Sequence, residues 1–242
     1  MLAPVRAAFE HSHQRYGYRR IWRVLRDQGI RVCAKCIMRL MARHGITPRL
    51  KRRKRHDSYS GEHTPAPANL VNRRFHAKAP NRLWVTDITE FHIKAGKIYL
   101  SALIDCYDGM PVAWAIGTNP TAGLANGMLE QACAILKDGE RPVIHSDRGG
   151  HYRWPEWIAI CESHGLTRSM SAKGCSPDNA AAEGFFGRLK QEFYHNQDHQ
   201  DQSIDEFIDD LDDYLVWYRD ERIKTEYGTS IRRHRQQLGL MA

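Results

Sequence analysis

The chain has 242 residues, enough for one large domain with a smaller one, and too few for three full-sized domains. Apolar residues make up 42% and charged residues 26%, which excludes a wholly disordered chain. It contains no run of 18 apolar residues and no apolar signal-peptide core near its start, so we expect neither a membrane span nor secretion. Six scattered cysteines are typical of a protein of the reducing cytoplasm.

Charge divides the chain unevenly. Residues 1–80 carry 19 Lys and Arg against four Asp and Glu, whereas the remaining residues carry 17 against 24. Residues 1–80, called the basic front below, precede a mildly acidic remainder of the chain. This distribution predicts that the basic front binds a polyanion, and nucleic acid is the leading candidate. The alternative is a basic tail that serves only solubility.

The basic front has the pattern of two short helices. Residues 19–26 place apolar side chains on one face and arginines on the other, and Gly29 ends this helix. A second helix is predicted over 35–44, ending at Gly45. The pair makes residues 1–48 a small all-α, helix-turn-helix-like region that we expect to bind DNA, although such pairs also occur in bundles that bind nothing.

A linker is predicted over residues 49–79, since it has no apolar periodicity. It opens with a basic run and then becomes rich in Ser, Gly, Thr and Pro. A flexible basic arm would follow DNA phosphates with a steep dependence on salt. The residues expected to make these contacts are Lys51, Arg52, Arg53, Lys54 and Arg55.

Residues 80–195 alternate strand-like and helix-like segments, which predicts an α/β fold with a mixed sheet. Asp108-Gly109 is a strong hairpin signal. The predicted strands are 83–91, 97–107, 111–117, 142–145 and 166–169, and the predicted helices are 122–136, 155–164 and 177–194. Residues 196–242 are predicted to be a helical extension, because the acidic stretch 198–213 keeps an amphipathic apolar stripe.

Three carboxylates stand out by their surroundings. Asp87 lies inside a predicted core strand, where an unpaired buried charge costs several kcal/mol. Asp147 follows the strand 142–145 directly, at the end where α/β proteins place ligand groups. Glu183 lies on the predicted helix 177–194.

That helix presents a continuous polar face. Asn179, Glu183, Gly187 and Lys190 are spaced four, four and three residues apart, and Ser176 with Pro177 predicts where the helix begins. Together the three acids have the chemistry of a Mg²⁺ site, in which two ions about 4 Å apart would serve phosphoryl transfer. The alternative for each acid is a solvated or salt-bridged carboxylate.

At these residues the sequence resembles the DDE transposases, most closely bacterial insertion-sequence family three, whose second reading frame encodes a retroviral-integrase-like core. The resemblance rests on Trp84–Thr89, His145–Tyr152 and Ser176–Glu183, and on the 35 residues that separate Asp147 from Glu183. Lys190 matches the basic residue that the family uses against DNA. The segments at 16–21, 39–41 and 218–230 resemble the family's terminal regions.

The resemblance implies an RNase H-like mixed five-stranded sheet with flanking helices. It implies Asp87, Asp147 and Glu183 as catalytic residues and ligands of two Mg²⁺ ions, with Mn²⁺ as substitute, in the cleavage and strand transfer of DNA. The implied partners are the terminal inverted repeats, target DNA, further copies of the chain and a first-frame fusion partner, in the bacterial cytoplasm at the nucleoid. The further DNA contacts that we expect are Lys190, Asn179, Arg148, Arg19 and Arg20.

Two departures from the family leave alternatives open. Ile231 stands where the family usually has Pro, and family members generally carry more sequence before Tyr16. The chain is therefore expected to be the second frame alone, a fragment or a remnant copy. A catalytically inactive DNA-binding regulator and an RNase H-like nuclease are the competing functions.

Cysteine and histidine give weaker signals. Cys33 and Cys36 have metal-ligand spacing but no second pair follows, so we expect them to pack in a helical core. His145 and His151 flank Asp147 and could orient a phosphate or water, or be simple loop residues.

Overall fold

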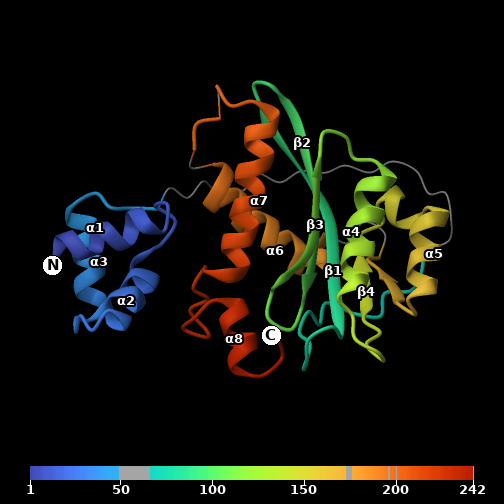
Figure 1. Ribbon diagram of the computed structural model, residues 1–242, viewed down its shortest axis with the longest axis horizontal. Coiled ribbons are helices and arrows are strands. Elements are labelled where there is room, and N and C mark those ends of the chain that lie inside the picture. The colour runs from blue at the N-terminus through green and yellow to red at the C-terminus, as the bar shows by residue number, and fades with distance from the viewer. Residues whose placement is uncertain (49–65, 173–175, 196, 200, 242) are drawn as a thin grey trace. The chain divides into compact units, whose positions relative to one another are not determined.

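The computed structural model describes residues 1–48, 66–172, 176–195, 197–199 and 201–241. They form two compact units, each drawn in Figure 1. The first combines Met1–Arg52, Gln191–Asn196 and Val216–Ala242, and the second combines Arg53–Lys190 and Gln197–Leu215. In the first unit, the start of the chain, its end and a short internal segment fold together.

The second unit is built on a mixed five-stranded sheet with the order β3-β2-β1-β4-β5, which confirms the expected fold class. The first three strands are antiparallel, and β4 and β5 run parallel to β1. Gly109 has a φ of +75° in the turn between β2 and β3, a conformation that favours glycine. The strands are β1 Leu83–Ile93, β2 Gly96–Asp105, β3 Pro111–Gly117, β4 Val143–Ser146 and β5 Thr167–Met170.

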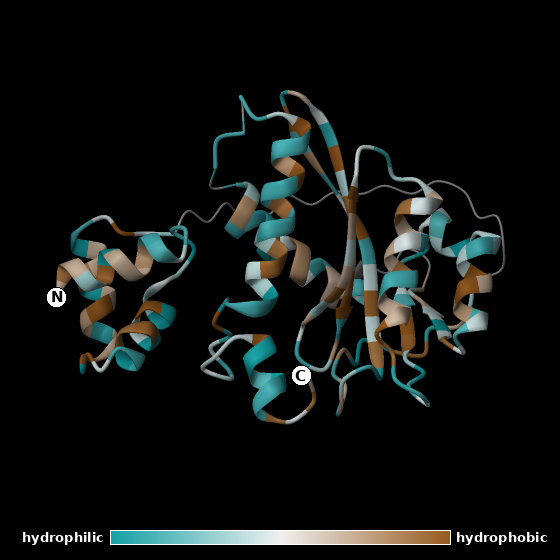
Figure 2. Cartoon of the chain, viewed as in Figure 1, coloured by the Kyte–Doolittle hydropathy of each residue, from teal (hydrophilic) through white to brown (hydrophobic). Residues whose placement is uncertain are grey.

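Helices cover both faces of this sheet. Figure 1 shows α4 (Ala122–Ala134) and α5 (Pro155–Ser163) on one side, with α6 (Ala180–Leu189) and the start of α7 (Ile204–Asp220) on the other. Hydrophobic and hydrophilic residues alternate along the strands in Figure 2. On β1, Trp84 packs in the core that contains α4 and α5. Phe91, of opposite parity, meets Phe207 of α7 at 5.5 Å between ring centroids.

The expected single helix over 177–194 is wrong in its details. The structure has a 3-10 helix at Ser176–Asn179, the α-helix α6, and a π-helix at Lys190–Tyr194. Asn179 has φ −121° and ψ 26°, which lies outside helical geometry and separates the first two pieces. The π-helix buries Glu192 and Phe193, which are neighbours in the chain. Such turns are often found at functional sites.

The first unit contains the basic front. Its helices α1 (Leu2–His11), α2 (Tyr18–Asp27) and α3 (Ala34–Arg43) share one apolar core, and Trp217 and Ile223 pack against that core. Helix α8 (Ile231–Gln237) lies near the end of the chain. The helix pair expected at 19–26 and 35–44 is confirmed, and no separate helix was predicted for α1 or α8. In the described part of the chain, no helix has the length and hydropathy needed to span a membrane.

The prediction that Cys33 and Cys36 pack in a core is wrong, since both are exposed. The core of this unit takes Ile37 and Met41 from α3. Cys33 would share their face if it were helical, but it is the N-cap of α3 and has extended backbone angles.

Candidate active site

Strand pairing brings two of the three acids together. Strand β4 runs parallel to β1 with Thr86 opposite Ser146, so Asp87 and Asp147 come next in register. Neighbouring strands lie about 5 Å apart. Asp147 is the first residue after β4, at the carboxyl end of the strand. The sheet thus places these two carboxylates level with one another.

Helix α6 supplies the third acid. The helix packs on β1, and Glu183 lies in its first turn. The pKa of Asp87 is raised well above its usual value by burial, by the charge of Asp147 and also by the charge of Glu183. A hydrogen bond of 2.8 Å from the backbone N–H of Ile88 opposes this shift. Asp87, Asp147 and Glu183 therefore share one electrostatic environment.

The three acids lie near one another, but their side chains do not form a complete metal-binding site. Among the described residues, no three His, Cys, Asp or Glu side chains are grouped closely enough to hold a metal ion. Asp147 instead accepts a hydrogen bond of 2.8 Å from the backbone N–H of Gly149. Unscreened carboxylates repel one another, so a cation is the species that would draw these three together.

Two further side chains have buried polar atoms that could serve a ligand. Asn179 is only 4% exposed, and neither its Oδ1 nor its Nδ2 has a hydrogen-bond partner in the described part of the chain. Nε2 of His151 is likewise buried without a partner there. Each unsatisfied buried polar group costs about 1–3 kcal/mol. The carboxylate oxygens and these unused amide and imidazole atoms fit a hard cation and its phosphate ligands.

His151 is held beside Asp147. Its ring packs edge-on against Tyr152, with 4.3 Å between the ring centroids. A Cβ atom added to Gly149 would lie 2.9 Å from both Asp147 Oδ1 and His151 Nε2. Gly149 therefore lets the two side chains approach, and the hypothesis that His151 orients a phosphate or water stays open.

His145 has a structural position instead. It is fully buried, and its Nδ1 lies 2.8 Å from the Ser169 hydroxyl. Its Nε2 lies 2.8 Å from the carbonyl oxygen of Asp178, which can only accept, so Nε2 carries the proton. With both ring nitrogens bonded within the protein, His145 has none left for substrate.

Asp178 anchors the segment before α6, a role that the sequence pattern did not reveal. Its carboxylate accepts hydrogen bonds from Arg73 at 2.7 Å, from Asn69 at 3.0 Å and from the backbone N–H of Ala172 at 3.1 Å. Arg73 is the main reason that the pKa of Asp178 is lowered. These bonds fix the start of the helix that carries Glu183.

Lys190 lies on the Asp87 face of β1. Its Nζ is 5.4 Å from the centre of the Phe91 ring. Burial lowers the pKa of Lys190, whereas the charges of Glu90 and Asp87 raise it. The lysine therefore puts a positive charge close to the acids, where a phosphate would be expected.

The other expected DNA contacts have different surroundings. Arg148 is half-buried and donates from Nε to the carbonyl oxygen of Ser171 at 3.0 Å. Arg19 is exposed and bonds to the hydroxyl of Tyr18 at 3.2 Å. The basic run Lys51, Arg52, Arg53, Lys54 and Arg55 lies outside the described residues.

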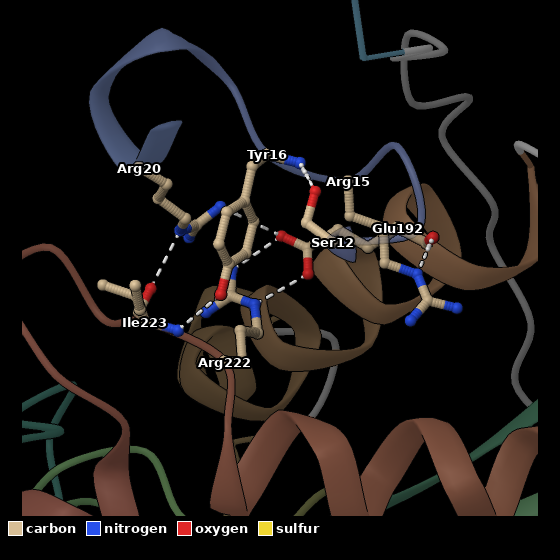
Figure 3. Close-up of polar contacts among 7 residues, drawn as sticks. All are labelled: Ser12, Arg15, Tyr16, Arg20, Glu192, Arg222 and Ile223. Atoms are coloured by element: carbon tan, nitrogen blue, oxygen red, sulfur yellow. Dashed lines mark hydrogen bonds and ion pairs between the residues drawn. The ribbon is translucent and has the colours of Figure 1, made fainter. Parts of the chain in front are cut away.

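Arg20 belongs to a buried ion network inside the first unit, drawn in Figure 3. At its centre, the Glu192 carboxylate accepts hydrogen bonds of 2.7 and 2.6 Å from Nε and Nη2 of Arg222. Arg20 lies 3.5 Å from the same carboxylate, and its Nε donates to the carbonyl oxygen of Ile223 at 2.9 Å. Arg20 is thus already bound within the protein.

The same network fixes the connection between α1 and α2. Arg15 donates from Nε to the carbonyl oxygen of Glu192 at 2.9 Å, and the Tyr16 hydroxyl accepts from the N–H of Ile223 at 2.8 Å. Figure 3 shows the side chains of Arg15 and Tyr16 reaching the segments around Glu192 and Arg222, while the Ser12 hydroxyl accepts a hydrogen bond of 3.2 Å from the backbone N–H of Tyr16. Sequence reasoning missed this cluster because its partners are up to 207 residues apart.

A Gly149→Ala substitution tests the packing around Asp147. The added methyl group would meet Asp147 Oδ1 and His151 Nε2 at 2.9 Å, so one of them must move. We expect any reaction that depends on these carboxylates to slow by at least about tenfold, since small displacements of reacting groups are costly. Gly123→Ala is the control, because its nearest neighbour would lie at 3.7 Å. Equal activity of the two variants would contradict the assignment.

Comparison with known families covers most of the chain. A family model described as "Integrase core domain" matches residues 77–176, and another with the same description matches residues 183–238. A model described as "HTH-like domain" matches residues 1–55.

Curated relatives agree with these models. The chain is 52% identical over 239 residues to the "Probable transposase for insertion sequence element IS1353" of Shigella flexneri, covering 98% of this chain and 46% of that protein. It thus spans less than half of that relative's length. It is 36% identical over 215 residues to the "Putative transposase InsK for insertion sequence element IS150" of Escherichia coli K12, covering 89% of this chain and 75% of that protein.

A solved chain of a viral intasome shares the fold of this chain. A chain of a simian T-cell lymphotropic virus intasome in complex with PP2A regulatory subunit B56 gamma covers 93% of this chain and 72% of its own length, with a TM-score of 0.54 and 18% identity. The HTLV-2 integrase catalytic core domain in complex with magnesium covers 64% of this chain and 95% of its own length, at 17% identity and a TM-score of 0.47. The chain is also 36% identical over 193 residues to the "Transposase InsF for insertion sequence IS3A" of Escherichia coli K12, covering 80% of this chain and 67% of that protein. With the integrase core and HTH-like matches and these two Escherichia coli relatives, this chain belongs to the IS3 family of insertion-sequence transposases.

Proposed function

We propose that this chain catalyses metal-dependent cleavage and strand transfer of DNA at the ends of an insertion sequence. Asp87, Asp147 and Glu183 would hold two Mg²⁺ ions, with Mn²⁺ as a substitute. The observation that carries the proposal is the placement of the three acids: the register of β1 and β4 sets Asp87 level with Asp147, and α6, which carries Glu183, packs on β1. Burial, and then the charges of the other two carboxylates, raise the pKa of Asp87. Family membership supports the same reaction.

The metal would supply the charge that activates an attacking oxygen and stabilises the leaving one. The protein's own groups would do the positioning. Asn179 has an unused amide N–H group and carbonyl oxygen for a phosphate or a water molecule. Lys190 would offset phosphate charge beside Asp87, and the half-buried Arg148 would contact the DNA backbone near Asp147.

The partners follow from this reaction. We propose terminal inverted repeats and target DNA as substrates, bound by several copies of the chain, with the first-frame product as a possible fusion partner. Such substrates would bring the protein to the bacterial nucleoid. Arg19 and the run 51–55 remain the proposed phosphate contacts of the basic front, whereas we now assign Arg20 to Glu192.

Strand transfer tests the proposal directly. The substrate is a labelled duplex taken from the DNA that borders the coding sequence, with a free 3′-hydroxyl, and a plasmid serves as target. We expect joined products that require Mg²⁺ or Mn²⁺ and disappear when an unrelated duplex replaces the end. Cleavage without joining would favour the nuclease instead. Binding without either reaction would favour the inactive regulator.

Metal binding can be measured without any reaction. A cation that binds only the folded state at 100 times its dissociation constant adds about 2.7 kcal/mol of stability. For a chain of this size we expect Mg²⁺ to raise the melting temperature by about 5–10 °C and EDTA to reverse the rise. K⁺ at matched ionic strength separates specific binding from screening. A melting temperature that does not respond to Mg²⁺ or Mn²⁺ would contradict the metal site.

A further inference from the structure

Cys33 and Cys36 form an exposed pair of thiols whose role is not explained by the proposed function. Their sulfur atoms lie 3.2 Å apart and share a hydrogen bond. Cys33 is the N-cap of α3, and Cys36 lies in the first turn with its backbone N–H bonded to the Cys33 carbonyl oxygen at 3.0 Å. The two thiols therefore meet at the start of a helix and are open to solvent.

The two sulfur atoms differ in their electrostatics. The pKa of Cys33 is lowered, mainly by the hydrogen bond that it shares with the Cys36 side chain and then by the backbone N–H groups of Cys36 and Lys35. The same hydrogen bond raises the pKa of Cys36. A thiolate at a helix N-terminus is the more nucleophilic partner of such a pair. This asymmetry gives the two cysteines different chemical roles.

A metal site does not explain the pair. In the described part of the chain, no third His, Cys, Asp or Glu side chain joins the two sulfurs in a group able to hold a metal. Structural zinc sites need four such ligands. Core packing is excluded by the exposure of both residues. Thiol chemistry is what remains.

We propose that Cys33 and Cys36 are a thiol–disulfide exchange site for small-molecule disulfides such as oxidised glutathione. The Cys33 thiolate attacks one sulfur of the disulfide and forms a mixed disulfide, and the first glutathione leaves as a thiolate that takes up a proton. Cys36 then attacks the Cys33 sulfur, loses its proton and releases the second glutathione. Two protein thiols become one disulfide while one glutathione disulfide becomes two thiols.

The remaining described cysteines provide an internal contrast. Cys106, Cys133 and Cys161 are buried, and burial raises their pKa values to about 12, 11 and 12. They are therefore almost entirely protonated at neutral pH and shielded from reagents. Among the described cysteines, reaction with a soluble disulfide should therefore concentrate at Cys33 and Cys36.

Peptide mapping tests this chemistry on the full chain. The protein is equilibrated with reduced and oxidised glutathione, its free thiols are blocked with iodoacetamide, and it is digested with trypsin. Trypsin cuts after Arg31, Lys35 and Arg39, so a disulfide would join the peptides 32–35 and 36–39. We expect this joined pair to form as oxidised glutathione increases and to vanish with dithiothreitol. Complete alkylation of both thiols under oxidising conditions would overturn the proposal.

Single variants separate the two roles. Cys36→Ser should accumulate glutathione on Cys33, since no second thiol can release it. In Cys33→Ser, glutathione should modify Cys36 at least about tenfold more slowly than it modifies Cys33 in Cys36→Ser. Alkylation of Cys33 should outpace that of Cys36 in the native protein, most clearly below pH 8, and the two rates should converge in urea. Equal rates in the native protein would contradict a Cys33 nucleophile.

The position of the site connects it to DNA binding, and this step rests on the proposed function. Helix α3 exposes Lys35, Arg39 and Arg43. Glutathione on Cys33 adds bulk and a net negative charge, so the Cys36→Ser adduct should bind duplex DNA several-fold more weakly than the same variant without glutathione. Equal affinities with the adduct in place would remove α3 from the DNA interface and leave the thiol chemistry standing.

Discussion

An Asp87→Asn variant is expected to lose strand-transfer activity by about a thousandfold or more, in Mg²⁺ and in Mn²⁺. The amide keeps the size of the side chain but removes the charge that would hold the cation between β1, Asp147 and α6. A loss of about 4 kcal/mol in transition-state stabilisation gives a thousandfold change in rate. Initial rates of joined product with a labelled duplex end measure it.

The same variant should be more stable than the parent when EDTA is present. Burial and the charges of Asp147 and Glu183 oppose ionisation of Asp87, so removing its charge relieves repulsion in the folded state. Chemical unfolding in urea measures this change, and the stabilisation by Mg²⁺ should disappear. Asp138→Asn, on an exposed loop, is the matched control and should change neither property. Retained activity in Asp87→Asn would refute the catalytic assignment.

A Glu192→Ala substitution is expected to destabilise the first unit by about 3–5 kcal/mol. It leaves the guanidinium of Arg222, only 1% exposed, without its carboxylate partner, and breaking a buried ion pair from one side costs this much. Hydrogen exchange followed by mass spectrometry should show lost amide protection in α1, α2 and α8. Strand β1, in the other unit, should keep its protection.

Two control variants distinguish the effect of breaking the buried Glu192–Arg222 pair from the general effect of removing a charge. Asp27→Asn removes one side of the exposed Arg23–Asp27 pair and should change stability by less than about 0.5 kcal/mol. A Glu192→Met, Arg222→Met double variant should be closer to the parent than Glu192→Ala, since it leaves no unpaired charge at this pair. If the single variant exchanged like the parent, the network would not hold the unit together.

The sequence predicted the sheet well, because β1 alternates its faces and Asp108-Gly109 marks a tight turn. The three acids could be found because a carboxylate in a core strand and another at a strand end are unusual. That the three acids lie close together in space could be expected only from the family resemblance, since strand order and register depend on contacts between distant segments. The pairing of Thr86 with Ser146 supplies that register.

Three features could not be predicted from local pattern. Glu192 pairs with Arg222 thirty residues away, and no periodicity marks either as buried. The π-helix at 190–194 changes which side chains turn inward. Cys33 fits a helical core face by spacing, yet its extended N-cap backbone exposes it. In each case a tertiary contact or a helix end decides the outcome.

The buried bonds around Glu192 have a consequence for building hybrid transposases. The basic front is completed by the segments Gln191–Asn196 and Val216–Ala242, so its apolar and ionic surfaces are shared with them. A hybrid that exchanges only the first 50 residues between two relatives would place Glu192 and Arg222 against residues of the other relative that do not match them. Altering where such an enzyme binds DNA therefore calls for transplanting all three segments of the first unit as a matched set.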